Sequence, residues 1–173
     1  MTMQTDVLQS RLTQSGWIVQ SACRVKGISL RNAATGVGRV FLFDTDTTPV
    51  TAAYGRSGTT VTVTKTAHGL QTGATVSLGF SLDGSNRSAT CGTYTITRVD
   101  ADTFTLTDYN TGTVSTSTTC YYVTGDSRWL WVRGLADTDI YNNYELLPGE
   151  GIRAKQRVYA VISNVISTSV FYG

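Results

Sequence analysis

Apolar and polar residues alternate along much of the chain with the two-residue period of a β-strand. Residues 60–64 show this most clearly, because Val61 and Val63 fall on one face and the threonines on the other. The same pattern predicts further short strands at 74–80, 93–99, 103–107 and 114–123. Turn-forming residues separate them at 83–86 and 108–110. The middle of the chain is therefore expected to be a small all-β module.

Longer and more apolar strands are predicted on either side of this module. Residues 23–30 and 37–43 flank a turn that contains Gly36, and we expect them to form a β-hairpin. The second strand carries apolar residues on both faces, which predicts an inner strand or one covered on both sides. Three more strands are expected at 128–133, 156–162 and 169–172, with a short apolar run at 165–166 between the last two.

The two flanks share a composition that the middle lacks, which predicts one lobe inserted into another. Residues 17–53 plus 126–173 are expected to form a discontinuous, jelly-roll-like β-sandwich that serves for docking. Residues 54–125 are expected to form an inserted, threonine-rich β-barrel module. Residues 1–16 are expected to be an N-terminal arm, with one short helix as the open alternative.

Composition narrows the function classes. The net charge is +2, which is far from the concentrated basic charge that nucleic-acid binding needs. No segment is apolar and long enough to span a bilayer, and no secretory signal is visible, so we expect neither a membrane partner nor export and place synthesis in the cytoplasm. Threonine is the commonest polar residue, which favours β-structure because its branched side chain suits a sheet.

Two runs of sequence resemble known modules. The pattern AHGL…TG…V at 67–76, followed by YTITRVDADTFTL at 94–106, resembles the first catalytic cysteine half-domain of ubiquitin-activating enzymes, a small β-barrel without a nucleophile that recurs in phage virion proteins. The runs RVKGISLRN, VFLFDTD and the ending from Leu147 are similar to small tailed-phage virion proteins. That resemblance implies a β-sandwich of the head-decoration, knob or fibre-base type.

The sequence contains few residues that are candidates for catalysis. The single histidine, His68, precedes Gly69 and is expected in a turn, and Asp100 and Asp102 are expected to bond nearby backbone N–H groups. The other acidic pairs leave a cation or a glycosidase-like pair as minor alternatives. The three cysteines have no metal-ligand spacing and are expected to be buried thiols, although Cys91 and Cys120 facing each other on paired strands stays open. We expect no catalytic residue, no metal and no cofactor.

Aromatic residues near the C-terminus are the candidate interface. On a strand at 128–133, one face would carry two tryptophans beside an arginine, residue types that are enriched at binding hot spots, while packing in the sandwich core is the competing interpretation. The ends of the chain are also expected at subunit contacts. The expected interface residues are Trp129, Trp131, Arg133, Tyr141, Tyr144, Val170, Phe171 and Tyr172.

These observations predict a non-enzymatic structural protein of a bacteriophage virion. The first expectation is a capsid decoration or knob protein on the head surface, with the inserted module projecting outward. Its partners would be the major capsid protein or another virion protein, together with copies of itself in an oligomer such as a trimer. The alternative is a tail-fibre or tail-tip module that binds a host receptor or glycan, and a cell-wall hydrolase is a third hypothesis.

Overall fold

The structure is a computed structural model that describes residues 7–33, 36–135 and 143–173, except the side chains of residues 135 and 143. The described residues form antiparallel β-strands, turns and bends without a helix, which confirms the all-β prediction. None of these residues belongs to a helix long and apolar enough to cross a membrane. The chain divides into two compact units: Met1–Asp46 with Leu130–Gly173, here the sandwich unit, and Thr47–Trp129, here the inserted unit.

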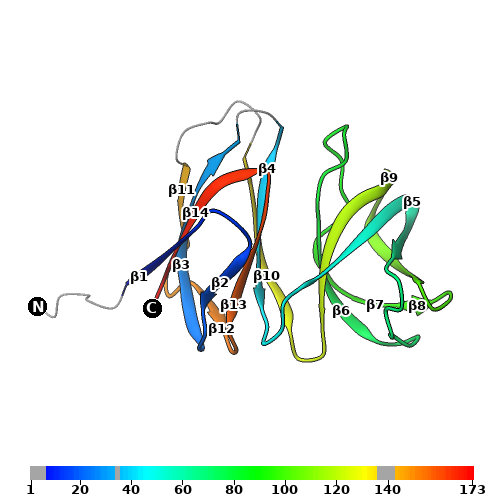
Figure 1. Cartoon of the computed structure of the whole chain (residues 1–173), viewed down its shortest axis with the longest axis horizontal. Helices are drawn as coiled ribbons and strands as arrows, with labels where there is room; N and C mark the ends of the chain where they lie inside the picture. The colour runs from blue at the N-terminus through cyan, green and yellow to red at the C-terminus, as the bar shows by residue number, and fades with distance from the viewer. Residues whose placement is uncertain (1–6, 34–35, 136–142) are drawn as a thin grey trace, which may run out of the picture. The chain divides into compact units, whose positions relative to one another are not determined.

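Two sheets form the sandwich unit (Figure 1). The first has the strand order β1-β14-β3-β11, with β12 also paired to β3, and the second has the order β10-β4-β13-β2. Their strands are β1 (Leu8–Leu12), β2 (Gly16–Val19), β3 (Cys23–Asn32), β4 (Gly38–Asp44), β10 (Arg128–Leu135), β11 (Asn143–Leu146), β12 (Ile152–Ala154), β13 (Val158–Ser163) and β14 (Val165–Tyr172).

The core of the sandwich unit draws on both sheets. Ile28 and Leu30 of β3 and Val170 of β14 belong to the same buried cluster as Val40 and Leu42 of β4. Burying each such side chain contributes about 1.5–3 kcal/mol, so this shared core holds the two sheets together. The opposite face of the first sheet is left to carry polar residues.

The predicted hairpin between residues 23–30 and 37–43 is wrong. The strands β3 and β4 lie in different sheets, so the chain passes from one layer of the sandwich to the other between them. This crossing lets Leu30 and Leu42 pack in one core, whereas a hairpin would place their strands in one layer. The strand β4 is an inner strand with Phe41 and Phe43 also buried, as its apolar faces predicted.

The N-terminal segment provides a strand rather than the alternative helix. The strand β1 pairs antiparallel with β14, from Leu8 opposite Tyr172 to Leu12 opposite Thr168. This pairing gives partners to main-chain groups along one side of β14, and β3 pairs with the other side. Both sides of β14 are therefore hydrogen-bonded within the chain.

The inserted unit is one sheet with the order β5-β9-β6-β7, and β8 also pairs with β9. The sheet has two free ends in this order and is not closed into the barrel that the sequence predicted. Register shifts interrupt the long β5–β9 pairing between Tyr54 and Arg56 and again between Gly58, whose φ is +62°, and Thr60. The strands are β5 (Val50–Thr64), β6 (Thr75–Phe80), β7 (Gly92–Thr95), β8 (Thr97–Arg98) and β9 (Thr103–Thr124).

The turn predicted at 108–110 is wrong, because β9 runs through it without a break. Asp108 points inward and forms an ion pair with Arg56 of β5, and it also accepts a hydrogen bond from the Thr90 N–H. Residues 108–110 have the composition of a turn, but the buried partners of Asp108 hold them in the strand.

Candidate functional site

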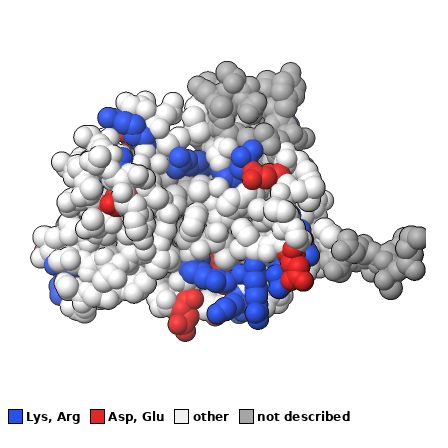
Figure 2. Space-filling view, turned by 180° about the vertical axis from the view of Figure 1, so that it is seen from behind, with Lys and Arg blue, Asp and Glu red and all other residues white. Residues whose placement is uncertain are grey.

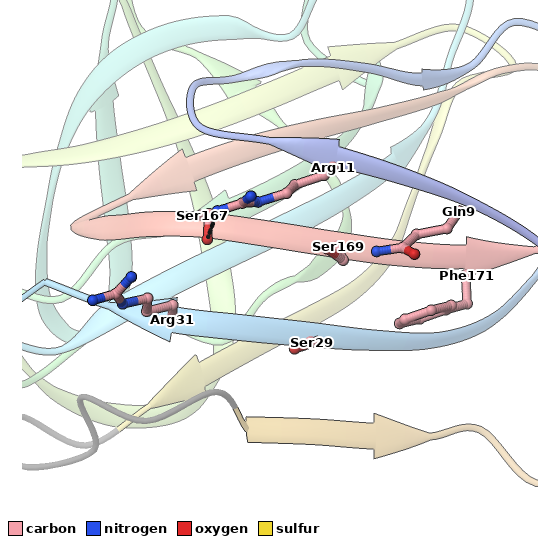
Figure 3. Close-up of a pocket in the computed structure, with 7 residues that line it drawn as sticks. All are labelled: Gln9, Arg11, Ser29, Arg31, Ser167, Ser169 and Phe171. Carbon is pink, nitrogen blue, oxygen red and sulfur yellow. Dashed lines mark hydrogen bonds between the residues drawn. The ribbon is translucent and has the colours of Figure 1, made fainter.

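A polar groove lies on the face of the first sheet that points away from the sandwich core (Figure 3). It has a volume of about 360 Å³ and crosses three neighbouring strands, β1, β14 and β3. Alternate residues of each strand line it, as the pleat of a sheet requires. The lining residues are Gln9, Arg11, Ser29, Arg31, Ser167, Ser169 and Phe171.

Strand register sets the order of these side chains. Arg11 lies opposite Ser169, which in turn lies opposite Ser29. The next row pairs Ser167 with Arg31. Side chains directly opposite on neighbouring strands have their Cβ atoms about 4.5–5.5 Å apart, so the serines form a hydroxyl-bearing floor between the two arginines.

Both arginines are exposed and lie toward the same end of the groove. An Nη atom of Arg11 lies 3.5 Å from Ser167 Oγ, and Arg31 stands opposite Ser167 on the neighbouring strand. Among the described residues neither guanidinium forms an ion pair with a carboxylate. This end of the groove therefore carries two positive charges that the described part of the chain does not neutralise.

The other end of the groove is aromatic. The rings of Phe171 and Tyr144 pack edge to face with their centroids 5.2 Å apart. Gly27 lies beneath Tyr144, and a Cβ placed there would come within 3.3 Å of the Tyr144 hydroxyl. Glycine at this position lets the tyrosine lie close to the sheet, where its ring supports Phe171.

This arrangement offers several kinds of group that bind polar ligands. Guanidinium groups bind carboxylates and phosphates, hydroxyl and amide groups exchange hydrogen bonds with polar ligands, and an aromatic ring packs on apolar surface. The groove lining contains neither a carboxylate nor a histidine or cysteine that could act as a base or nucleophile.

Two of the predicted interface residues, Tyr144 and Phe171, meet at this groove. The others in the C-terminal strand do not join them. Val170 is fully buried in the core, and Tyr172 packs against that core with its hydroxyl 3.2 Å from Ser10 Oγ. The alternation along β14 separates Phe171 from its two neighbours. The use of these residues as an interface stays a prediction.

The strand β10 places three of the remaining candidates, Trp129, Trp131 and Arg133, in the other sheet. Trp131 packs against the sandwich core, and so does Leu130, so the core does not separate the two faces of this strand as either interpretation expected. Arg133 forms an ion pair with Glu145, with 2.9 Å between Nε and the carboxylate oxygen. Trp129 is half-buried. Tyr141 lies outside the described residues.

His68 and its acidic neighbours stabilise a turn, as predicted. The Nδ1 atom of His68 accepts a hydrogen bond from the Leu70 N–H, and Gly69 has a φ of +70°. Asp102 accepts a hydrogen bond from the Ala67 N–H. Asp100 accepts one from the Asp102 N–H, and this bond lowers the pKa of Asp100.

The cysteines are free thiols, and Cys91 and Cys120 are not joined by a disulfide. Burial, together with the charge of Asp44, raises the pKa of Cys23 to about 11, so its thiol is protonated at neutral pH. In the part of the chain that the structure describes, no three His, Cys, Asp or Glu side chains gather closely enough to hold a metal ion.

Sequence analysis missed Arg11 and Arg31, which are the charged groups of the groove. The alternation that carries them was visible in Ser29 and Arg31 and in the Ser167, Ser169 and Phe171 series. It did not show that these polar faces belong to adjacent strands.

Figure 2 shows one face of the molecule, on which Lys and Arg lie in small groups with Asp and Glu nearby rather than as one continuous basic surface.

The similarity of the chain to known proteins is low. No family model matches the chain, and no curated protein matches it. Among solved structures the chain is similar to a chain described as phage phi92 endosialidase, with 19% sequence identity and a TM-score of 0.33. The match covers 84% of this chain and 21% of that chain. A similarity this low carries no argument about function, and the resemblance of the inserted unit to the ubiquitin-activating half-domain stays a prediction.

Proposed function

We propose that the protein is a non-enzymatic binding component of a bacteriophage virion. The observation that carries the binding role is the groove on the first sheet, because it offers two arginines, three serines and an aromatic ring, and its lining holds no carboxylate or histidine that could activate a serine as a general base. The virion assignment is supported by the similarity of the flanking sequence runs to small tailed-phage virion proteins. No metal or cofactor enters this proposal.

The first candidate role is decoration of the head surface through contacts with the major capsid protein. A stable site of this kind buries about 1,200–2,000 Å² in total, and repetition over a lattice multiplies a modest affinity at each site. The test is co-sedimentation of the purified protein with expanded capsids. Saturable binding to capsids without adsorption to host cells supports this role, whereas the reverse result contradicts it.

The second candidate role is a tail-fibre or tail-tip module that binds a host receptor or glycan. The sequence placed such a ligand on Trp129 and Trp131, but Trp131 packs against the sandwich core. The groove lined by Arg11, Arg31 and Phe171 is the better site because both of its arginines are exposed and accessible to a ligand. Adsorption of the labelled protein to host cells, and competition by soluble host polysaccharide, test this role.

Self-association is part of the proposal, with a trimer as one expected state. Both sides of β14 are already paired, so a neighbouring subunit would contact side chains rather than add a strand to β14. Sedimentation equilibrium of the isolated protein measures the mass directly. A hydrolase would instead shorten peptidoglycan or capsule polysaccharide, and turnover of either would overturn the non-enzymatic assignment.

A further inference from the structure

We propose that the groove on the β1-β14-β3 face binds an acidic saccharide, with the sugar carboxylate held between Arg11 and Arg31 and the sugar ring lying toward Phe171. This inference rests on the proposed binding function and names its ligand class. In this arrangement the carboxylate of the sugar lies at the end of the groove around Ser167.

Charge is the first argument. Arg11 reaches to within 3.5 Å of Ser167 Oγ, and Arg31 stands opposite the same serine. Two guanidinium groups around one hydroxyl repel each other unless an anion lies between them. The described residues supply no carboxylate there, although both arginines are exposed and accessible. A bound carboxylate would accept charge-assisted hydrogen bonds from both side chains.

The chemistry of the rest of the groove is the second argument. Ser29 and Ser169 carry hydroxyls at its floor, and Gln9 adds an amide, so the lining can both donate and accept hydrogen bonds with sugar hydroxyls. Phe171, supported by Tyr144, offers a ring for the apolar face of a sugar. The groove is thus cationic at one end, hydroxyl-rich in the middle and aromatic at the other end.

Size and strand pairing favour a saccharide over a peptide. A volume of about 360 Å³ lies at the small end of the range for small-ligand sites. Extended peptides bind sheets mainly by pairing with a free edge. The groove is centred on β14, with β1 and β3 on either side of it, and β14 is already paired along both of its edges. A peptide lying along the groove would therefore find no free main-chain groups on its central strand.

The test is calorimetric titration of the full chain with a panel of oligosaccharides that carry uronic or sialic acids. The same oligosaccharides with their carboxyl groups reduced to alcohols, and a hexaglutamate peptide, serve as comparisons. We expect at least one acidic oligosaccharide to bind, and its reduced form to bind at least about tenfold more weakly, because a hydrogen bond to a charged group is worth about that factor or more.

Variants locate the site. Arg11→Gln and Arg31→Gln should each weaken binding by about tenfold or more. Lys155→Gln removes one positive charge from an exposed position outside the groove and should leave affinity unchanged. Because Arg11 and Arg31 are exposed, their variants should keep the melting temperature of the original protein, which confirms that lost binding is not lost folding.

Four results would overturn the inference: no acidic oligosaccharide binds, the reduced forms bind equally well, hexaglutamate binds more tightly, or the arginine variants bind like the original protein. Retained association with capsids or host cells in any of these cases leaves the proposed function standing. Shortening of the oligosaccharides during titration would instead contradict the non-enzymatic function itself. The two proposals therefore fail in distinguishable ways.

Discussion

The carboxylate of Asp44 accepts a hydrogen bond from the backbone N–H of Gln156, with 2.7 Å between nitrogen and oxygen, although 112 residues separate the two in the chain. Its second oxygen accepts another from the backbone N–H of Lys155 at 2.9 Å. Asp44 ends β4 and is buried, and the two N–H groups belong to the turn that precedes β13. One carboxylate thus fixes the turn that leads into the neighbouring strand.

Replacing Asp44 with alanine should lower the free energy of unfolding by about 2–4 kcal/mol, because two backbone N–H groups lose a charged acceptor. Asp44→Asn should cost less, since the amide oxygen still accepts one of the bonds. Chemical denaturation followed by far-UV circular dichroism measures both. Asp46→Asn is the matched control: Asp46 is exposed and its ion pair with Arg157 is 3.5 Å long, so its loss should cost less than about 1 kcal/mol. Equal effects at positions 44 and 46 would contradict this role.

Sequence predicted the strands well because burial of one face imposes a period of two, which is visible locally at Val61 and Val63. It could not predict strand pairing. The strands β3 and β4 looked like a hairpin but belong to different sheets, because contacts of Leu30 and Leu42 across the core decide the topology. The candidate site could not be predicted from the sequence for the same reason. Arg11 and Ser167 are 156 residues apart in the chain. They lie beside Arg31 only because β14 pairs with β1 on one side and with β3 on the other.

The ion pair between Arg56 and Asp108 should be essential to the inserted unit. The two side chains are 8% and 0% exposed. Burial acts to raise the pKa of Asp108, but hydrogen bonds from Thr90 and Arg56 outweigh it and lower the pKa. Asp108→Ala leaves the guanidinium of Arg56 buried without this partner and should cost about 3–5 kcal/mol. Urea denaturation measures the loss.

A double variant separates the pair from its surroundings. Arg56→Met combined with Asp108→Leu removes both charges and should recover much of the stability that Asp108→Ala loses, because no unpaired charge remains. Arg24→Gln is the control: its ion pair with Glu150 is exposed, at 39% and 78% of the two side chains, and should be worth less than about 1 kcal/mol. A double variant as unstable as Asp108→Ala would show that the carboxylate acts mainly through Thr90.

Asp83 should make stability depend on pH in the acid range. Its burial favours the neutral form, yet hydrogen bonds from Arg87 and Ser85 prevail and lower the pKa from 3.8 to about 2. A depressed pKa in the folded state stabilises the fold above the unfolded value, and this contribution is lost as pH falls from about 4 to about 2. Carboxyl-carbon NMR titration of Asp83 measures the shift directly.

The corresponding variant is Asp83→Asn. The difference in unfolding free energy between it and the original protein should be present at pH 6 and shrink as pH falls through the interval between the two pKa values. Asp126→Asn changes an exposed carboxylate in the turn before β10, and at pH 6 it should change the free energy of unfolding by less than about 0.5 kcal/mol. A difference for Asp83→Asn that stays constant from pH 6 to pH 2 would contradict a role for its charge.

Gly27 ties the stability of β11 to the aromatic end of the groove. A Cβ at position 27 would lie 2.8 Å from the backbone oxygen of Glu145 and 3.3 Å from the Tyr144 hydroxyl. The first contact is with backbone, so Gly27→Ala must displace β11 rather than turn a side chain. We expect a loss of about 1–3 kcal/mol, as for an overpacked core. Chemical shifts of the Phe171 ring should change because its contact with Tyr144 is disturbed.

Gly84→Ala is the matched control, since a Cβ there would meet no atom within 4 Å. It should change neither stability by more than about 0.5 kcal/mol nor the Phe171 signals. If the groove binds a sugar against Phe171, Gly27→Ala should weaken that binding while Arg11 and Arg31 remain in place. Unchanged affinity together with shifted ring signals would mean that the arginine end alone holds the ligand, because the displaced tyrosine would then contribute nothing to recognition.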